Sequence, residues 1–270
     1  MADVIITGAS RGIGRALALE LSEPGRRLLL TARDGARLAS LASEIAARGG
    51  AALPFAADMA DRDEAALLGD RLAGVVEPGA TLVHNAGIWP VTREIVKGGL
   101  EASFALNHVG GLSLQRPLLA SRRIARVMVV SAGLIAKGRF DPARTPSGGD
   151  FSRLRSYANT KLCFAVAMRD VAAAHPEIDF VVLHPGVVRT ALGDSSGLLG
   201  ALLGFIKKRW EAPEVCAKRL ARILARDRWS PPGEARWLME EREAPWPAPA
   251  DDPRIRADLR AVTAKLFATP

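Results

Sequence analysis

The sequence predicts an α/β fold in which a parallel β-sheet is covered by helices on both faces. Three observations support this prediction. Short apolar segments alternate with amphipathic helical segments, a glycine-rich turn joins the first strand to the first helix, and polar residues follow the ends of several strands. Ligands bind at the carboxyl ends of the strands in open sheets of this kind. The pattern therefore indicates a nucleotide-binding protein.

The composition is that of one globular domain. The chain has 270 residues, of which 49% are hydrophobic and 24% charged, enough for a sizeable core. Its net charge is +8, but basic and acidic residues are interleaved, which favours a solvated arginine-rich surface over a nucleic-acid site. Two cysteines without metal-ligand spacing favour a reducing, cytoplasmic compartment and no metal site. We expect neither a signal peptide nor a transmembrane segment.

A phosphate-binding turn follows the first expected strand, residues 4–6. The turn has the spacing G-x-x-x-G-x-G, and the amphipathic helix after it ends before Pro24. The glycines let the backbone approach a pyrophosphate, and the helix N-terminus offers free N–H groups. We expect a dinucleotide cofactor bound at this turn to contact Gly8, Ser10, Arg11, Gly12, Ile13 and Gly14.

The second expected strand, residues 27–31, ends beside Arg33. In dinucleotide-binding folds this position holds an acid that binds the ribose 2′-hydroxyl or an arginine that accommodates a 2′-phosphate. Arg33 and Arg11 together offer two guanidinium groups, which favours NADP(H) over NAD(H). The adjacent Asp34 could weaken this preference, and Arg33 could also be an ordinary residue before a helix.

The alternation continues through two more strands. Asp58 follows the third strand, where an acid can bond the adenine amino group or cap the next helix, and Met59 lies beside it. Asn85, Ala86 and Gly87 follow the fourth strand and could brace the sheet or contact the cofactor. The expected helices span 35–48 and 61–76, and the expected strands span 51–57 and 81–84.

The second half of the chain completes a Rossmann-type doubly wound sheet of about seven strands. A helix is expected at 94–119, where Asn107 suggests a local bend or a bound water because asparagine disfavours helix interiors. Ser131 follows the fifth strand. We divide the chain into a catalytic domain, 1–245, and a proline-rich tail, 246–270. Helices are expected at 151–174, 212–225 and 255–267, and strands at 124–130, 178–183 and 236–239.

Tyr157 and Lys161 stand four residues apart on the helix expected at 151–174, so they share one face. A free phenol has a pKa near 10, and a nearby positive charge lowers it. A phenol tuned in this way can pass a proton to or from a reacting oxygen. The spacing also occurs in surface pairs without chemistry, although Tyr157 is the only tyrosine in the chain.

Taken together, these motifs resemble the short-chain dehydrogenase/reductase family of single-domain type. Residues 106–110, residues 156–162 and Arg33 are similar to its retinol-dehydrogenase and protochlorophyllide-reductase-like branch. The matching motifs occur in family order over residues 3–240: Thr7-Gly8-x-x-x-Gly12-x-Gly14, Asp58, Asn85-Ala86-Gly87, Asn107, Ser131, Tyr157-x-x-x-Lys161 and Pro185-Gly186-x-x-x-Thr190.

The resemblance implies a role for each residue. Tyr157 would be the general acid in carbonyl reduction and the base in alcohol oxidation, and Lys161 would lower its pKa and hold the nicotinamide ribose. Ser131 would donate a hydrogen bond to the substrate oxygen. Asn107 would bind a water that links Lys161 to solvent. Further cofactor contacts would be Pro185, Gly186, Val188 and Thr190.

Residues 190–210 usually form the substrate lid in this family. Here they are apolar and contain glycines, which suits a lipophilic ligand, although a packed helix and a contact with an anionic membrane are alternatives. Trp89 and Leu134 are further candidates to line the pocket. We expect an NADP(H)-dependent oxidoreductase for an apolar carbonyl or alcohol, compatible with a homo-oligomer. A non-catalytic nucleotide-binding regulator and a C=C reductase are the alternatives.

Overall fold

Eight strands form one sheet among the residues that the structure, a computed structural model, describes, which are 2–188 and 211–268. The strands are β1 Val4–Thr7, β2 Arg27–Ala32, β3 Ala51–Ala56, β4 Ala80–His84, β5 Ile124–Val130, β6 Asp179–His184, β7 Ala235–Met239 and β8 Arg242–Glu243. Their order is β3-β2-β1-β4-β5-β6-β7-β8, and only the pair of β7 and β8 is antiparallel. The predicted doubly wound parallel sheet is confirmed, with one short strand beyond the seven expected.

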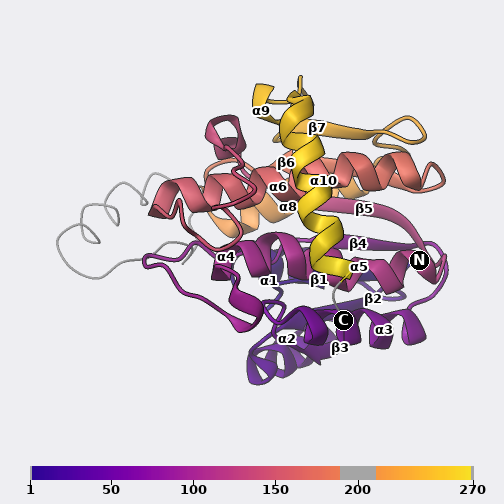
Figure 1. Cartoon of the computed structure of the whole chain (residues 1–270). Coiled ribbons are helices and arrows are strands. Elements are labelled where there is room, and N and C mark those ends of the chain that lie inside the picture. The colour runs from indigo at the N-terminus through magenta and orange to yellow at the C-terminus, as the bar shows by residue number, and fades with distance from the viewer. Residues whose placement is uncertain (1, 189–210, 269–270) are drawn as a thin grey trace.

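Helices cover both faces of this sheet (Figure 1). The longer helices are α1 Gly12–Glu20, α2 Gly35–Ala47, α3 Arg62–Val75, α5 Gly111–Ala120, α6 Arg153–Ala174, α8 Pro213–Leu224 and α10 Pro253–Ala268. One apolar cluster joins the sheet to α1, α2 and α8, and another joins it to α3, α5, α6 and α10. Successive strand side chains point to opposite faces, so Ile5 belongs to one cluster and its neighbours Val4 and Ile6 to the other.

The strand order reverses between β1 and β4, which pair side by side at the middle of the sheet. The chain leaves β1 toward one edge and leaves β4 toward the other, so the connections diverge above the carboxyl ends of these strands. A crevice forms at such a switch point. The glycine turn after β1 and Asn85 after β4 both lie there, as the sequence predicts.

The helix expected at 94–119 is wrong in its first part. Helix begins only at α4, Ala102–Phe104, and the preceding residues form a loop with a short 3₁₀ turn, Lys97–Gly99. Gly98 and Gly99 both have positive φ, at 83° and 76°, a conformation that an α-helix cannot include. The irregularity expected around Asn107 takes the form of a π-helix, Ala105–Gly110, which leads into α5.

The C-terminal residues pack onto the rest of the chain. The helix expected at 255–267 is α10, which crosses α6 in Figure 1 and follows the short helix α9, Ala248–Asp251. Leu259 of α10 is buried in the core, and Asp170 of α6 pairs with both Arg256 and Arg260. The domain boundary at residue 245 stays a prediction.

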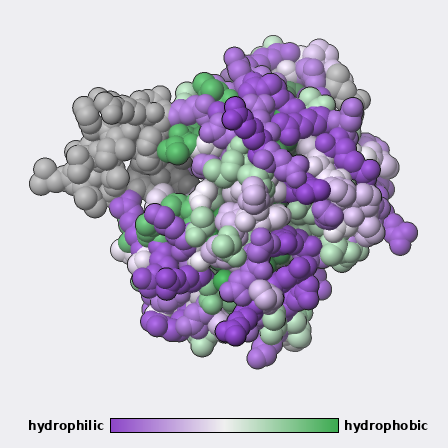
Figure 2. Space-filling view, turned by 90° about the horizontal axis from the view of Figure 1, so that it is seen from above, coloured by the Kyte–Doolittle hydropathy of each residue, from purple (hydrophilic) through white to green (hydrophobic). Residues whose placement is uncertain are grey.

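The face of the molecule seen from above in Figure 2 is mostly hydrophilic. Figure 2 shows one face on which hydrophilic residues predominate and hydrophobic residues occur between them in small groups. Within residues 2–188 and 211–268, no helix has the length and apolar character that crossing a bilayer requires.

Candidate active site

A cleft of about 480 Å³ opens at the carboxyl ends of the strands and gathers most of the predicted site residues. Gly14, Asp58 and Asn107 lie near it without forming its wall, and Thr190 lies outside the described residues, as does the expected lid. Ile88 contributes to the wall, whereas Trp89 and Leu134 do not. The predicted residues that line the cleft are Gly8, Ser10, Arg11, Gly12, Ile13, Arg33, Met59, Asn85, Ala86, Gly87, Ser131, Tyr157, Lys161, Pro185, Gly186 and Val188.

The glycine turn is shaped by close backbone approaches. Gly8 has a φ of +68°, and a Cβ there would lie 2.8 Å from the Cα of Ala86. A Cβ on Gly14 would lie 2.5 Å from Asn85 Nδ2, so this glycine lets α1 pack against the end of β4. Arg11, before α1, makes no side-chain cap, which leaves the first N–H groups of the helix free to bind an anion.

Asn85 braces the turn against the sheet. Its Nδ2 donates to the carbonyl oxygens of Thr7 and Gly8 at 2.9 and 3.3 Å. The hydroxyl of Thr7 accepts the backbone N–H groups of Asn85 and Ala86, both at 3.0 Å. The ends of β1 and β4 are therefore tied together directly beneath the cleft.

Three arginines stand at one end of the cleft, which we call the arginine end: Arg11, Arg33 and Arg37. Arg37 was not among the residues predicted from the sequence, although its place in the first turn of α2 was a usable signal. Asp34 caps α2 by accepting the N–H of Arg37 at 3.0 Å, and its carboxylate also pairs with the Arg37 guanidinium. The carboxylate of Asp34 is therefore engaged at the start of α2, and Arg33 lies 4.0 Å from the carboxylate of Asp58.

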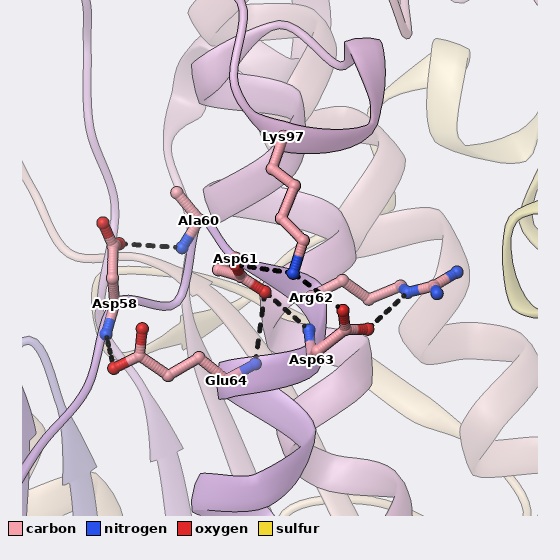
Figure 3. A network of polar contacts seen from close by, with 7 residues as sticks. All are labelled: Asp58, Ala60, Asp61, Arg62, Asp63, Glu64 and Lys97. Carbon is pink, nitrogen blue, oxygen red and sulfur yellow. Dashed lines mark hydrogen bonds and ion pairs between the residues drawn. The ribbon is translucent and has the colours of Figure 1, made fainter. Parts of the chain in front are cut away.

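Asp58 turns its carboxylate to its own loop (Figure 3). Its Oδ1 accepts the N–H of Ala60 at 2.9 Å, whereas Asp61 accepts the N–H groups of Asp63 and Glu64 and so caps α3. The alternative in which Asp58 caps the helix is therefore wrong. Lys97 reaches Asp61 and Asp63 at 3.1 and 2.9 Å. Hydrogen bonding to Lys97 lowers the pKa of both carboxyls.

The other end of the cleft, the tyrosine end, contains Ser131, Tyr157 and Lys161, all at most 6% exposed. Lys161 Nζ donates to the carbonyl oxygen of Val130 at 3.1 Å, and burial lowers its pKa to about 8. Burial also raises the pKa of Tyr157 above its ordinary value near 10. The expectation that Lys161 lowers the pKa of Tyr157 is thus wrong for this geometry, because desolvation of the phenolate dominates.

Ser131 presents an unused hydroxyl to the cleft. Its backbone N–H donates to Leu183 at 2.8 Å, which continues the pairing of β5 with β6, but its Oγ is buried without a partner among the described residues. The Nδ1 of neighbouring His184 is buried in the same way, and its ring also lines the cleft. Buried polar atoms without partners are costly, so both are available to a ligand. His184 was not among the site residues predicted from the sequence.

Asn107 reaches the tyrosine end from the π-helix behind it. Its side chain accepts the N–H of Ile88 at 2.8 Å and donates to the Ile88 carbonyl at 3.0 Å and to Thr160 Oγ1 at 3.1 Å. Gly87 separates Asn107 from Lys161, since a Cβ there would lie 3.3 Å from Asn107 Oδ1 and 3.1 Å from Lys161 Nζ. The side chains of Asn107 and Lys161 therefore both approach the backbone at Gly87.

Comparison with known proteins identifies the family of the chain. The family model for short chain dehydrogenases matches residues 2–140. The chain belongs to the short-chain dehydrogenase family. Within it, the similarity to retinol dehydrogenases confirms the predicted branch: mouse retinol dehydrogenase 14 is 31% identical over 207 residues, covering 70% of this chain and 62% of the relative.

Two further similarities come from a bacterial relative and a solved structure. A Streptomyces sp. (strain C5) protein provisionally named daunorubicin C-13 ketoreductase DnrU is 34% identical over 194 residues, covering 70% of this chain and 67% of the relative. An alcohol dehydrogenase from the archaeon Thermococcus sibiricus, complexed with 5-hydroxy-NADP, has a TM-score of 0.68 at 23% identity, covering 91% of this chain and 100% of that structure. The second similarity supports the fold alone.

Proposed function

We propose that this short-chain dehydrogenase is an NADP(H)-dependent oxidoreductase that interconverts a carbonyl and an alcohol. The observation that supports this most is the meeting of two features in one cleft. A glycine turn at a helix N-terminus opens into it, and so does a buried group of Ser131, Tyr157 and Lys161. The first suits a pyrophosphate and the second suits proton transfer to a reacting oxygen.

The residues at hand fit a nicotinamide dinucleotide. Gly8 and Gly14 let the turn and α1 pack closely on Ala86 and Asn85. The turn and the N-terminus of α1 suit a pyrophosphate, and Arg11, Arg33 and Arg37, which line the same cleft, would bind a 2′-phosphate. Hydride is what the nicotinamide ring supplies when the cofactor is bound. Three guanidiniums at the arginine end favour NADP(H) over NAD(H).

The tyrosine end would handle the proton. A phenol with its ordinary pKa near 10 is protonated at neutral pH, and burial raises the pKa of Tyr157 further, so its hydroxyl would hold the proton that the substrate oxygen takes during carbonyl reduction. The unpartnered Ser131 Oγ would donate a hydrogen bond to the same oxygen. Lys161 would hold the ribose, and Asn107 would support the proton path from solvent to Lys161.

For the substrate we propose an apolar aldehyde, ketone or secondary alcohol. Two relatives are named for acting on daunorubicin and on retinol, and the cleft wall includes the apolar side chains of Ile88, Leu106 and Val188. A cytoplasmic location, a homo-oligomer and a lid at 190–210 stay predictions. A non-catalytic regulator would have no need of Ser131, Tyr157 and Lys161 together.

Calorimetry on the full chain tests the cofactor first. We expect NADPH to bind more tightly than NADH, and a panel of carbonyl compounds to be reduced with NADPH. Equal binding of both cofactors would refute the phosphate preference, while no binding of either would refute the oxidoreductase. Reduction of small polar carbonyls only would refute the apolar substrate, and a saturated product from an enone would favour C=C reduction.

A further inference from the structure

A second aromatic ring covers Tyr157 from outside the cleft wall. Trp89 stacks on Tyr157 with ring centroids 4.7 Å apart and planes inclined by 13°. Its indole N–H donates to the carbonyl oxygen of Arg153 at 2.6 Å. Arg153 begins α6, and Tyr157 follows it by about one turn. Trp89 therefore holds the first turn of α6 at two points, the backbone and the phenol ring.

The backbone that carries Trp89 is itself held in place. Ile88, the residue before it, exchanges two hydrogen bonds with the side chain of Asn107, at 2.8 and 3.0 Å. The turn before Ile88 is tied to β1 through the hydroxyl of Thr7. The indole is thus a fixed platform, since both its main chain and its N–H have defined partners.

We propose that Trp89 is the positioning residue of Tyr157: it sets the direction of the phenol ring and keeps water from the covered face. Tyr157 lines the cleft, whereas Trp89 does not, so Trp89 acts through Tyr157. The effect of Trp89 on catalysis rests on the proposed function, whereas its effect on the orientation and solvation of the Tyr157 ring does not.

The phenol itself supplies the test. Tyr157 is the only tyrosine, so the near-ultraviolet absorbance of phenolate reports this side chain alone. We would titrate the full chain with alkali while following phenolate absorbance and far-ultraviolet circular dichroism. In the wild type, phenolate should form only together with loss of the helical signal. In Trp89→Leu, it should form at a lower pH, nearer to about 10, while the helical signal persists.

Three further variants complete this experiment. Tyr157→Phe must abolish the absorbance change. Trp246→Leu removes an indole that packs on Trp237, at 5.7 Å between centroids, and it should titrate as the wild type does. Trp89→Phe keeps a ring but loses the N–H, so its phenolate should form at an intermediate pH, and it replaces the leucine variant if that one does not fold. The proposal would be overturned if phenolate formed at the same pH in both Trp89 variants as in the wild type.

Turnover separates this inference from the proposed function. If the wild type reduces a carbonyl with NADPH, Trp89→Leu should lower kcat by roughly tenfold to a hundredfold, because a misplaced catalytic group loses its attack geometry. Its affinity for NADPH should not change. An unchanged kcat would overturn the positioning role. A wild type that binds no NADPH would defeat the proposed function, whereas the phenol titration would still decide the place of Trp89.

Discussion

The arginine end of the cleft and the tyrosine end differ in exposure, and exposure decides how each end handles charge. Arg33 and Arg37 keep 62% of their side-chain surface exposed, whereas Tyr157 and Lys161 are each only 6% exposed. Exposed guanidiniums stay charged and well solvated, so they attract an anion at little cost in desolvation. Buried groups instead favour their neutral forms, which is why the pKa of Tyr157 rises and that of Lys161 falls.

This difference assigns separate tasks to the two ends. Substitutions at the arginine end should change the affinity for the cofactor. Added salt should weaken the contacts made there, since exposed charges are screened. Contacts at the tyrosine end should change the rate and its pH dependence, because they control a proton. Four predictions test this division, in order of decreasing effect.

The largest effect is expected from Tyr157→Phe. The variant keeps the ring that stacks on Trp89 but loses the hydroxyl that would donate the proton. The kcat for carbonyl reduction should fall by about 10²–10⁴-fold, the usual contribution of a general acid. Calorimetry should give the same affinity for NADPH as in the wild type. A variant with normal turnover would show that the tyrosine end does not handle the proton.

A second effect concerns the two histidines buried behind the tyrosine end. Burial lowers the pKa of His84 to about 4 and that of His108 to about 3, below the ordinary 6.5. Below pH 6.5 the unfolded chain therefore binds more protons than the folded chain. The stability that the neutral histidines contribute is fully present above pH 6.5 and is lost as the pH falls toward 4. Two such groups give a slope of about 2.7 kcal/mol per pH unit at most.

Urea unfolding between pH 7 and pH 5 measures this slope. His108→Phe places a third ring between Phe104 and Phe164 and should remove about half of it. An unchanged slope in His108→Phe would mean that other groups cause the loss of stability in acid.

A third effect should appear at the arginine end. Arg33→Ala and Arg37→Ala should each weaken NADPH binding by about tenfold, at the low end for charged hydrogen bonds because both side chains are exposed. NADH binding should not change, and added salt should reduce the difference. Arg48→Ala, which removes a partner of Glu44 at the far end of α2, is the control. Equal losses for NADPH and NADH would contradict a 2′-phosphate site.

The smallest effects are expected in the exposed network of Figure 3. Asp61→Ala removes the N-cap of α3 and should lower the free energy of unfolding by about 1 kcal/mol. Lys97→Ala removes only surface ion pairs, in which the lysine side chain is 66% exposed, so thermal unfolding should not change measurably. A larger loss in Lys97→Ala than in Asp61→Ala would show that the ion pairs, and not the cap, stabilise this region.

Much of the fold and of the site follows from local sequence. Apolar segments of strand length that alternate with helical periodicity specify a parallel sheet, and the polar residues after β1, β4, β5 and β6 then meet at one edge. The spacing of Tyr157 and Lys161 places them on one face of a helix whatever surrounds it. These predictions succeed because each depends on backbone geometry over a few residues.

The tertiary structure decided what depends on partners distant in sequence. Arg37 joins the cleft because α2 starts beside it, Trp89 reaches Tyr157 across 68 positions of chain, and α10 packs on α6. The pKa of Tyr157 moved against the expectation drawn from Lys161, since burial comes from the whole fold and not from a neighbour four residues away. The sequence thus determined the elements and the spacing of the motifs within them, whereas packing determined which distant side chains meet and how much water reaches them.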